Sequence, residues 1–190
     1  MQKKIVVIGS NSFSGASFVT AALEAGYEVI GISRSREPNS VFLPYKKSGK
    51  SIEFHQLDLN HHLNKIKTLI ESKKPEYVVN FAAQSMVAQS WDQPSHWFTT
   101  NVLSTVQFHD HLRHCKFLKK YVHVSTPEVY GGCEGYVKES TSYRPSTPYA
   151  VSRAAADMSL YTFFKSYKFP VVFTRAANVY GPGQQLYRII

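Results

Sequence analysis

Apolar runs and amphipathic stretches alternate along the whole chain. Runs of strand-like residues lie at 4–9, 27–33, 51–59, 75–83, 119–126 and 169–183, the last including its exit loop. Stretches with apolar residues at helical spacing lie at 15–26, 61–74, about 95–115 and 148–167. Because the strands are continuous apolar runs, both faces of their sheet should be covered by helices. The pattern therefore predicts an α/β fold with a doubly wound parallel sheet.

Length and composition limit what such a chain can be. Its 190 residues suffice for one buried domain, so we expect a single Rossmann-type dinucleotide-binding domain over residues 1–190. No apolar run reaches the ~20 residues of a membrane span, and the N-terminus lacks signal-peptide features, which favours a cytoplasmic protein. The net charge of +9 is spread along the chain without a nucleic-acid-binding motif. It favours an anionic small molecule over nucleic acid as the partner.

The sequence pattern does not indicate a metal site. Cys115 and Cys133 are the only cysteines and lie far apart, as suits a reducing compartment. His111 and His114 can share a helical face, but the pattern shows no carboxylate or cysteine that completes a ligand set with them. We therefore interpret these histidines as part of a solvated helix face and expect no metal.

The first strand is followed by the turn GSNSFSG, residues 9–15. A dinucleotide-binding turn needs glycine for a tight bend, for close approach to the pyrophosphate and for packing of helix on strand. Gly9 and Gly15 fill the outer positions of this pattern, and Ser12 stands at the middle one. The Cβ of Ser12 lies where close approach is wanted, but its hydroxyl can donate to phosphate. Together with the N–H groups of the following helix, the turn predicts a phosphate site.

The ends of the second and third strands bear on the choice of cofactor. A carboxylate after the second strand would bind the adenosine ribose, but the chain has Ser33 followed by Arg34 and Arg36. Arginine suits a 2′-phosphate, so the sequence favours NADP, with NAD as the alternative and solvated loop arginines as the non-binding interpretation. Asp58, at the end of the third strand, is placed either to meet the adenine edge or to cap the next helix.

The candidates for chemistry surround the start of the last long helix. Tyr149 and Arg153 are four residues apart, about one helical turn, and so share a face. A cation beside a phenol favours the phenolate, which a tyrosine general base requires. Ser125 and Thr126 end the preceding strand and can reach the same place. A hydroxyl, a tyrosine and a cation beside a nicotinamide site suit hydride transfer.

Taken together, these motifs resemble the extended short-chain dehydrogenases/reductases of the nucleotide-sugar epimerase/dehydratase family. The resemblance rests on GSNSFSG (9–15), DLN (58–60), NFAAQS (80–85), STPEVYG (125–131), PYAVSR (148–153) and RAANVYGPG (175–183), which keep the family's order. It implies a Rossmann fold, a tightly held NAD(P) and a nucleoside-diphosphate sugar as substrate. It also implies a homodimer formed through the two long helices.

Within this family, STPEVYG is similar to the sugar-nucleotide 4,6-dehydratases of the dTDP-glucose or GDP-mannose type. The resemblance implies that Tyr149 takes the C4 hydroxyl proton as hydride passes to NAD(P), while Thr126 hydrogen-bonds the 4-oxygen. Glu128 would then remove the C5 proton, water would leave from C6, and hydride would return to C6. Arg153 stands at the position of the family's lysine. The alternative for Glu128 is a solvated loop carboxylate.

The resemblance also implies which residues contact the ligands. The cofactor-binding positions are Gly9, Asn11, Ser12, Phe13, Gly15, Ser33, Arg34, Arg36, Asp58, Leu59, Phe81, Ala82, Ala83, Gln84, Ser125, Tyr149 and Arg153. The substrate-binding positions are Ser85, Thr126 and Asn178.

Four departures from the family pattern leave other functions open. Ser12 replaces a glycine, Pro127 stands where a dTDP-glucose enzyme has an acid, and Arg153 replaces a lysine. Family members also continue beyond Ile190 into a smaller substrate-binding region, so we expect this chain to lack that domain and to bind cofactor better than it turns over substrate. The alternatives to a dehydratase are a nucleotide-sugar C4-epimerase or related oxidoreductase, which needs no C5 base, and a non-catalytic dinucleotide-binding protein.

Overall fold

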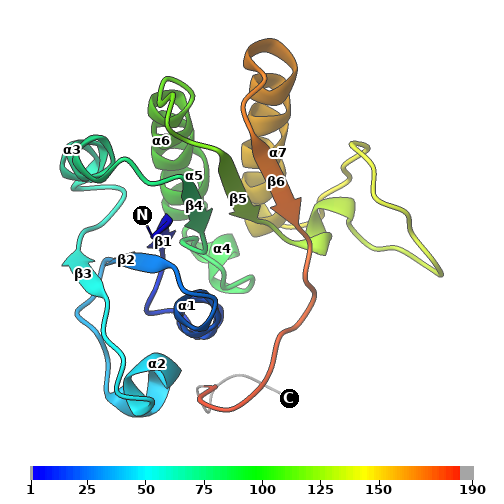
Figure 1. Ribbon diagram of the computed structural model, residues 1–190. Helices are drawn as coiled ribbons and strands as arrows, with labels where there is room; N and C mark the ends of the chain where they lie inside the picture. The colour runs from blue at the N-terminus through cyan, green and yellow to red at the C-terminus, as the bar shows by residue number, and fades with distance from the viewer. Residues whose placement is uncertain (1, 185–190) are drawn as a thin grey trace.

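A six-stranded sheet forms the centre of the computed structural model, which describes residues 2–184. The strand order is β3-β2-β1-β4-β5-β6, and every neighbouring pair is parallel (Figure 1). The strands are β1 (Lys4–Ile8), β2 (Glu28–Ser33), β3 (Glu53–Gln56), β4 (Tyr77–Asn80), β5 (Lys120–Val124) and β6 (Val171–Thr174). This is the strand order of a doubly wound dinucleotide-binding sheet, so the expected Rossmann-type fold is confirmed.

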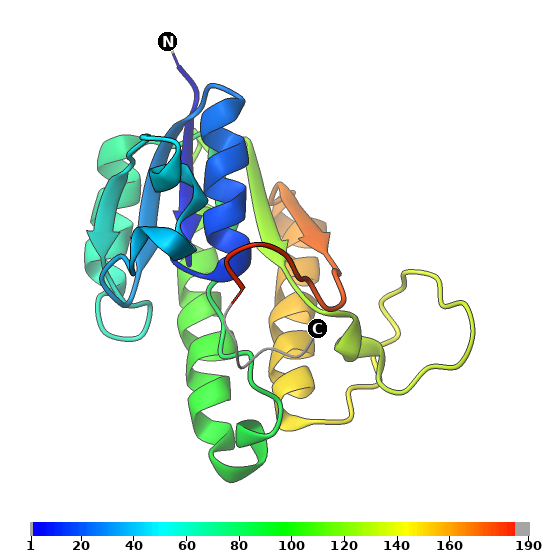
Figure 2. The ribbon, with the colours of Figure 1, turned by 90° about the horizontal axis from the view of Figure 1, so that it is seen from below.

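Helices cover both faces of this sheet (Figure 1, Figure 2). On one face lie α1 (Phe13–Glu24) and the short α2 (Pro44–Lys47); on the other lie α3 (Leu63–Lys73), α6 (Thr105–Leu112) and α7 (Pro148–Tyr167). The remaining segments are η1 (Ser40–Phe42), α4 (Gln89–Asp92), α5 (Pro94–Phe98), the π-helix η2 (Thr99–Ser104) and η3 (Pro127–Tyr130). Within residues 2–184, no helix is both long and apolar enough to cross a membrane.

The two faces of the sheet carry separate apolar cores. In β1, Val6 packs in one cluster with Ile70 of α3 and Phe108 of α6. Its neighbour Val7 points to the opposite face and packs in the other cluster with Val19 of α1. Successive strand residues therefore both meet an apolar layer, which explains why the strands read as unbroken apolar runs in the sequence.

Two segments differ from the sequence expectation. The helix expected at about 95–115 consists of α5, the π-helix η2 and α6, and it ends at Leu112. Within it, the Thr105 hydroxyl donates to the Thr100 carbonyl oxygen at 2.7 Å. The expected loop over 41–50 instead contains η1 and α2, because Tyr45 is fully buried against the α1 side of the sheet. Neither change alters the order of the strands.

Candidate cofactor site and active site

A pocket of about 500 Å³ opens where β1 and β4 are neighbours and the strand order reverses. Doubly wound sheets bind ligands at this place. The predicted site residues that line the pocket are Gly9, Asn11, Ser12, Phe13, Ser33, Arg34, Asp58, Leu59, Phe81, Ala82, Ala83, Ser85, Ser125 and Tyr149. The predicted residues outside its lining are Gly15, Arg36, Gln84, Thr126, Glu128, Arg153 and Asn178. The fold therefore brings the first turn, the ends of β2 and β4, and the start of α7 to one cavity.

Close packing requires the two outer glycines of the first turn. Gly9 has a φ of +83°, and a Cβ added to it would lie 2.8 Å from the backbone nitrogen of Ala82. A Cβ at Gly15 would collide with the carbonyl oxygen of Gly9. Only glycine at both positions lets the chain bend after β1 and lets α1 begin this close to the strand. These are the bend and the helix–strand contact that a dinucleotide-binding turn needs.

Ser12, at the middle position of the turn, is the N-cap of α1. Its hydroxyl accepts a hydrogen bond from the Gly15 backbone nitrogen at 3.1 Å and donates one to the Gly9 carbonyl oxygen at 2.7 Å. Its φ of −70° is open to any residue, so the backbone does not demand glycine here. Because the hydroxyl hydrogen is used within the turn, the donors available to a phosphate are the backbone N–H groups at the start of α1.

The end of β2 carries a hydroxyl and a cation where many dinucleotide sites carry a carboxylate. The Ser33 hydroxyl accepts a hydrogen bond from the Asn11 backbone nitrogen at 3.0 Å. The Asn11 side chain in turn donates to the carbonyl oxygens of Ser35 and Arg36, at 3.0 and 2.9 Å. These bonds hold the loop after β2 against the first turn. Arg34 and Arg36 are both exposed, and of the two only Arg34 lines the pocket.

Asp58 serves the turn before α3 while also lining the pocket. Its Oδ1 accepts hydrogen bonds from the backbone nitrogens of Asn60 at 2.6 Å and His61 at 3.3 Å. Its own backbone nitrogen donates to Nδ1 of His62 at 3.1 Å. The structure thus combines the two interpretations of Asp58: the carboxylate caps the turn and also lies at the pocket wall.

A buried asparagine that the sequence pattern did not reveal holds the segment after β4. Asn101 accepts a hydrogen bond from the Gln84 backbone nitrogen at 2.8 Å and donates to the Gln84 carbonyl oxygen at 3.0 Å. Its side-chain nitrogen also donates to the Ser152 hydroxyl at 2.9 Å. Asn101 therefore joins η2, α7 and the chain beside the pocket. Its partners lie 17 and 51 residues away, so no local motif could indicate them.

Tyr149 and Ser125 meet at the pocket from two different elements. Thr147 caps α7 by accepting from the Ala150 backbone nitrogen at 3.0 Å, and the Tyr149 backbone nitrogen donates to the Ser90 hydroxyl at 3.2 Å. The second bond ties the first turn of α7 to α4, and the Ser125 hydroxyl at the end of β5 reaches α7 by donating to Asp157. Both Tyr149 and Ser125 are largely buried and line the cavity, as the sequence pattern suggested for a strand end and a helix start.

The side chain of Arg153 is buried against β5. Its guanidinium donates to the carbonyl oxygen of Val124 and lies 3.5 Å from Nε2 of His123. Only 3% of the residue is exposed, and its Nε has no hydrogen-bond partner within residues 2–184. Burial, followed by the charge of Arg153, holds the pKa of His123 well below its usual range. His123 in turn lies 3.5 Å from Oδ1 of Asp157, so the carboxylate is separated from the Arg153 cation by this imidazole.

A second, largely buried arginine, which the sequence pattern did not single out, contacts Ser125. Nη1 of Arg175 lies 2.5 Å from Oδ2 of Asp157 and donates to the Ser125 hydroxyl at 3.0 Å. The Ser125 hydroxyl itself donates to Asp157 at 2.7 Å. Arg175 also donates to the Tyr143 hydroxyl at 2.8 Å and lies over the ring of Tyr130, 5.3 Å from its centroid. Tyr130 is thus a packing residue of this network.

Thr126, Pro127 and Glu128 form the start of η3. The Thr126 hydroxyl accepts a hydrogen bond from the Glu128 backbone nitrogen at 3.2 Å. Pro127 suits the first position of this short helix because it has no N–H to leave unpaired. Partial burial raises the pKa of the Glu128 carboxyl above its ordinary value. A carboxylate with a raised pKa is a better proton acceptor, which suits a general base.

Comparison with known proteins shows the family of the chain. A protein-family model described as GDP-mannose 4,6 dehydratase matches residues 6–189. The chain belongs to this family. The dTDP-D-glucose 4,6-dehydratase of Homo sapiens is 32% identical over 201 aligned residues, which cover 99% of this chain and 54% of the human protein. A dTDP-glucose 4,6-dehydratase of Xanthomonas campestris is 31% identical, covering 93% of this chain and 53% of that protein.

Solved structures of nucleotide-sugar enzymes share the fold of this GDP-mannose 4,6 dehydratase family member. The dTDP-glucose 4,6-dehydratase of Streptomyces venezuelae, solved with NAD bound, is 28% identical with a TM-score of 0.85, covering 98% of this chain and 59% of that one. The UDP-glucuronic acid 4-epimerase of Bacillus cereus, in complex with UDP-glucuronic acid and NAD, is 27% identical with a TM-score of 0.83, covering 97% and 60%. The family resemblance seen in the motifs is confirmed, and the chain spans about half the length of the curated relatives it matches.

Proposed function

We propose that the protein containing this chain is an NAD(P)-dependent nucleotide-sugar 4,6-dehydratase. The observation that carries the proposal is the meeting of Ser125 and Tyr149 in the pocket, with Thr126 and Glu128 following Ser125 at the same strand end. The relatives named as 4,6-dehydratases support it. The cavity of about 500 Å³ lies in the size range of small-molecule sites. Its first turn, with Gly9 and Gly15 and the free end of α1, fits a pyrophosphate.

Each reacting residue has a distinct task in this proposal. Tyr149 takes the proton of the C4 hydroxyl, and Thr126 hydrogen-bonds the 4-oxygen. Bound NAD(P) would supply the hydride chemistry, oxidation at C4 and reduction at C6. Glu128 removes the C5 proton, which the 4-keto group has made acidic. Because Pro127 has no proton to donate, the proton that Glu128 takes from C5 passes to the C6 hydroxyl, which leaves as water, and a solvent proton is added to C5 when hydride reaches C6.

Arg153 supplies the positive charge for this chemistry in place of the family's lysine. It is a buried cation, and no carboxylate of residues 2–184 forms an ion pair with it. A buried charge without a partner is costly unless a ligand or a neighbouring anion compensates it. We propose that the bound cofactor provides this compensation, and that Arg153 stabilises it.

NADP is the proposed cofactor, with NAD as the alternative. Ser33 replaces the ribose-binding carboxylate, and Arg34 and Asp58 are the charged residues of the described chain that line the pocket. Arginine binds a 2′-phosphate through charge-assisted hydrogen bonds. Arg34→Ala should weaken NADP⁺ binding about tenfold and leave NAD⁺ binding within about twofold, with Arg36→Ala as the control outside the lining. Tighter binding of NAD⁺ than of NADP⁺ by the unaltered chain would overturn this choice.

The nucleoside-diphosphate sugar, a homodimer and a cytoplasmic location complete the proposal. Ser85 lines the pocket, and Asn178 follows β6 and is exposed, so both can reach a substrate that extends outward from the cofactor. A dimer is supported by exposed apolar side chains on two packed helical segments, with Leu103 on η2 and Met158 and Phe164 on α7.

Replacing Glu128 by glutamine tests the proposed reaction. In D₂O, a dehydratase exchanges the substrate C5 hydrogen, whereas a C4-epimerase does not need to. We expect exchange and 4-keto-6-deoxy product with the unaltered protein, and loss of both by at least about 100-fold in Glu128→Gln, because general-base catalysis contributes about that much. Cofactor binding should stay unchanged in the variant. The assay is carried out on the protein that contains this chain, because the chain covers only about half the length of its curated relatives. Unaltered turnover in Glu128→Gln would favour the epimerase.

A further inference from the structure

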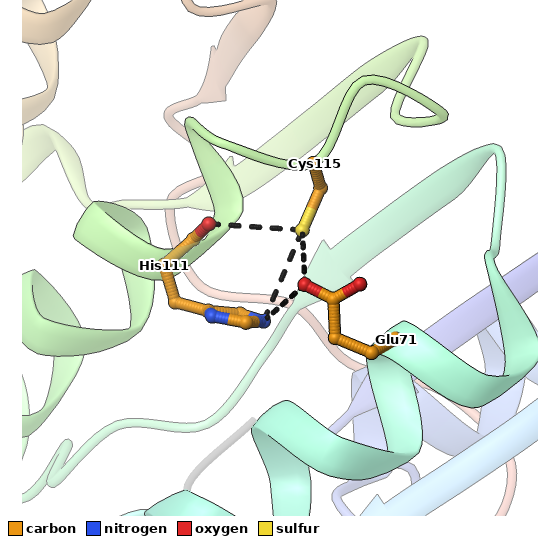
Figure 3. A group of neighbouring side chains, drawn as sticks. All are labelled: Glu71, His111 and Cys115. Atoms are coloured by element: carbon orange, nitrogen blue, oxygen red, sulfur yellow. Dashed lines mark hydrogen bonds and ion pairs between the residues drawn. The ribbon is translucent and has the colours of Figure 1, made fainter.

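Glu71, His111 and Cys115 form a side-chain cluster between α3 and α6 (Figure 3). Oε1 of Glu71 lies 3.5 Å from Nε2 of His111 and 3.8 Å from Sγ of Cys115. Sγ of Cys115 lies 3.9 Å from Nε2 of His111. Figure 3 shows the three ligand-type atoms turned toward one common point. Nitrogen, oxygen and sulfur therefore meet on the side of the molecule that the dehydratase chemistry does not use.

The three distances between these atoms are close to the distances between neighbouring ligand atoms in a tetrahedral zinc site. Ligands at about 2.0–2.1 Å for nitrogen and oxygen and about 2.3 Å for sulfur lie about 3.3–3.6 Å apart around a tetrahedral ion. The observed distances are longer by only about 0.2–0.4 Å, which small side-chain rotations can close. We propose that Glu71, His111 and Cys115 bind a zinc ion, with water as the fourth ligand.

The donor set favours zinc over the other common metal ions. Calcium and magnesium prefer shells made of oxygen, whereas one thiolate, one imidazole and one carboxylate suit Zn²⁺. The carboxylate and the thiolate balance both charges of the ion. The thiol proton is released to solvent when sulfur binds the metal. The side chain of Glu71 on α3 is half-exposed, so an ion and its water ligand can reach the cluster from solvent on this side.

The position of the cluster gives the ion a structural task. Glu71 lies in the last turn of α3, His111 in the last turn of α6, and Cys115 in the turn after it. None of the three lines the cofactor pocket. Because these helices run opposite to the strands, their C-terminal ends lie at the sheet edge away from the pocket. Zinc would therefore join α3 to α6 without touching the reacting groups.

This cluster separates the two histidines that the sequence analysis assigned together to a solvated helix face. His114, the other histidine of that face, is exposed and outside the cluster, whereas His111 is only 19% exposed in its side chain. Glu71 comes from another helix 44 residues before Cys115, so the pattern of α6 alone could not show the carboxylate. Cys115 lies one helical turn beyond His111, a spacing that already fits a shared site.

Metal titration of the chain tests the proposal. Cys133 is a second free thiol and is exposed, so the measurements start from Cys133→Ser to exclude metal binding there. We expect one equivalent of Zn²⁺ by calorimetry, and Co²⁺ as a probe should give a thiolate charge-transfer band with tetrahedral visible bands. X-ray absorption of the zinc form should show one sulfur at about 2.3 Å and lighter ligands at about 2.0 Å. At a hundredfold excess over Kd, zinc should raise Tm by about 5–10 °C.

Variants decide whether the cluster is responsible. Cys115→Ser should abolish the charge-transfer band, but Cys115 is buried and its loss can also weaken the fold. Glu71→Gln is the safer change, because its side chain is 55% exposed, and it should weaken zinc binding at least tenfold. His114→Asn, on the exposed side of the same turn, should bind zinc like the parent. Absence of zinc binding in the parent, or equal binding by Glu71→Gln and parent, would overturn the proposal.

Discussion

Asp157 and Arg175 form a buried ion pair that joins α7 to the end of β6, with Oδ2 and Nη1 2.5 Å apart. Both partners also bind the Ser125 hydroxyl, which lines the cofactor pocket. The side chain of Asp157 is fully buried and that of Arg175 is 11% exposed. The pair therefore determines where the end of β5 lies relative to α7, and hence where Ser125 lies relative to Tyr149.

Arg175→Met should be strongly destabilising. It leaves the Asp157 carboxylate buried without its cation, which costs about 3–5 kcal/mol in the free energy of unfolding. Urea denaturation followed by circular dichroism measures this change. The control is Lys73→Met, which breaks a half-exposed pair with Glu53 and should cost less than about 1 kcal/mol. Equal effects of the two changes would contradict the role given to the buried pair.

Two neutral histidines on either side of Tyr121 should make the fold sensitive to acid. His109 lies 2.7 Å from the Tyr121 hydroxyl, and burial lowers the pKa of His109 to about 3 from an ordinary value of 6.5. Between these two pH values the unfolded chain binds the proton and the folded chain does not. The free energy of unfolding should therefore fall as the pH drops from 6.5 toward 3. Burial acts in the same direction on the pKa of His123.

His109→Gln should reduce this loss of stability on acidification. Unfolding in urea at about pH 7, 5 and 4 measures how steeply the free energy of unfolding changes with pH, because histidine in the unfolded chain takes up its proton near about pH 6.5. Exposed His114→Gln is the matched control and should keep the parent's slope. Carboxylates contribute to the slope in all three proteins, so the difference between the variants is the informative quantity. A parent slope retained in His109→Gln would count against the buried neutral histidine.

The sequence predicted the sheet and much of the pocket because those features repeat locally. Apolar runs such as 4–9 identify strands covered on both faces, and the first turn carries its own glycines. The polar network was not predicted. Asp157 contacts Arg175, which is 18 residues further along the chain, and Asn101 contacts Ser152, which is 51 residues away. Only the folded structure shows that these residues are partners. The partners of Arg153 on β5 were missed for the same reason.

Ser12→Ala should weaken the start of α1. The change removes the N-cap bond to the Gly15 backbone nitrogen, which costs about 1 kcal/mol, within a range of about 0.5–2. Ser12→Gly, which restores the family's residue, should cost only a few tenths of a kcal/mol. Chemical denaturation compares the two. NADP⁺ affinity should be within about threefold of the parent in Ser12→Gly, because the phosphate donors are backbone groups. A large loss of affinity in Ser12→Gly would instead show that the hydroxyl binds the phosphate.

The raised pKa of Glu128 should appear in the pH dependence of the proposed reaction. A general base works only when ionised, so C5 exchange should decline on the acidic side as Glu128 takes up a proton. Burial moves this inflexion above the ordinary value of 4.5. Exchange rates measured from low to neutral pH locate the inflexion, and Glu128→Asp should shift it. An inflexion at or below 4.5 would contradict the assignment of Glu128 as the base.

Arg153→Met should separate binding from stability, in contrast to Arg175→Met. Arg153 is buried but has no carboxylate partner within residues 2–184, so removing its charge also removes a desolvation cost. That gain offsets the lost bond to the Val124 carbonyl oxygen, and the free energy of unfolding should change by less than about 1 kcal/mol. Since Arg153 is proposed to stabilise the bound cofactor, its loss should lower cofactor affinity at least about tenfold. Arg153→Lys keeps the charge, and its cofactor affinity should stay within about threefold of the parent.

Calorimetric titration with NADP⁺ measures the cofactor affinity, and urea denaturation measures the free energy of unfolding. A large loss of stability with unchanged affinity would instead make Arg153 a structural residue of β5.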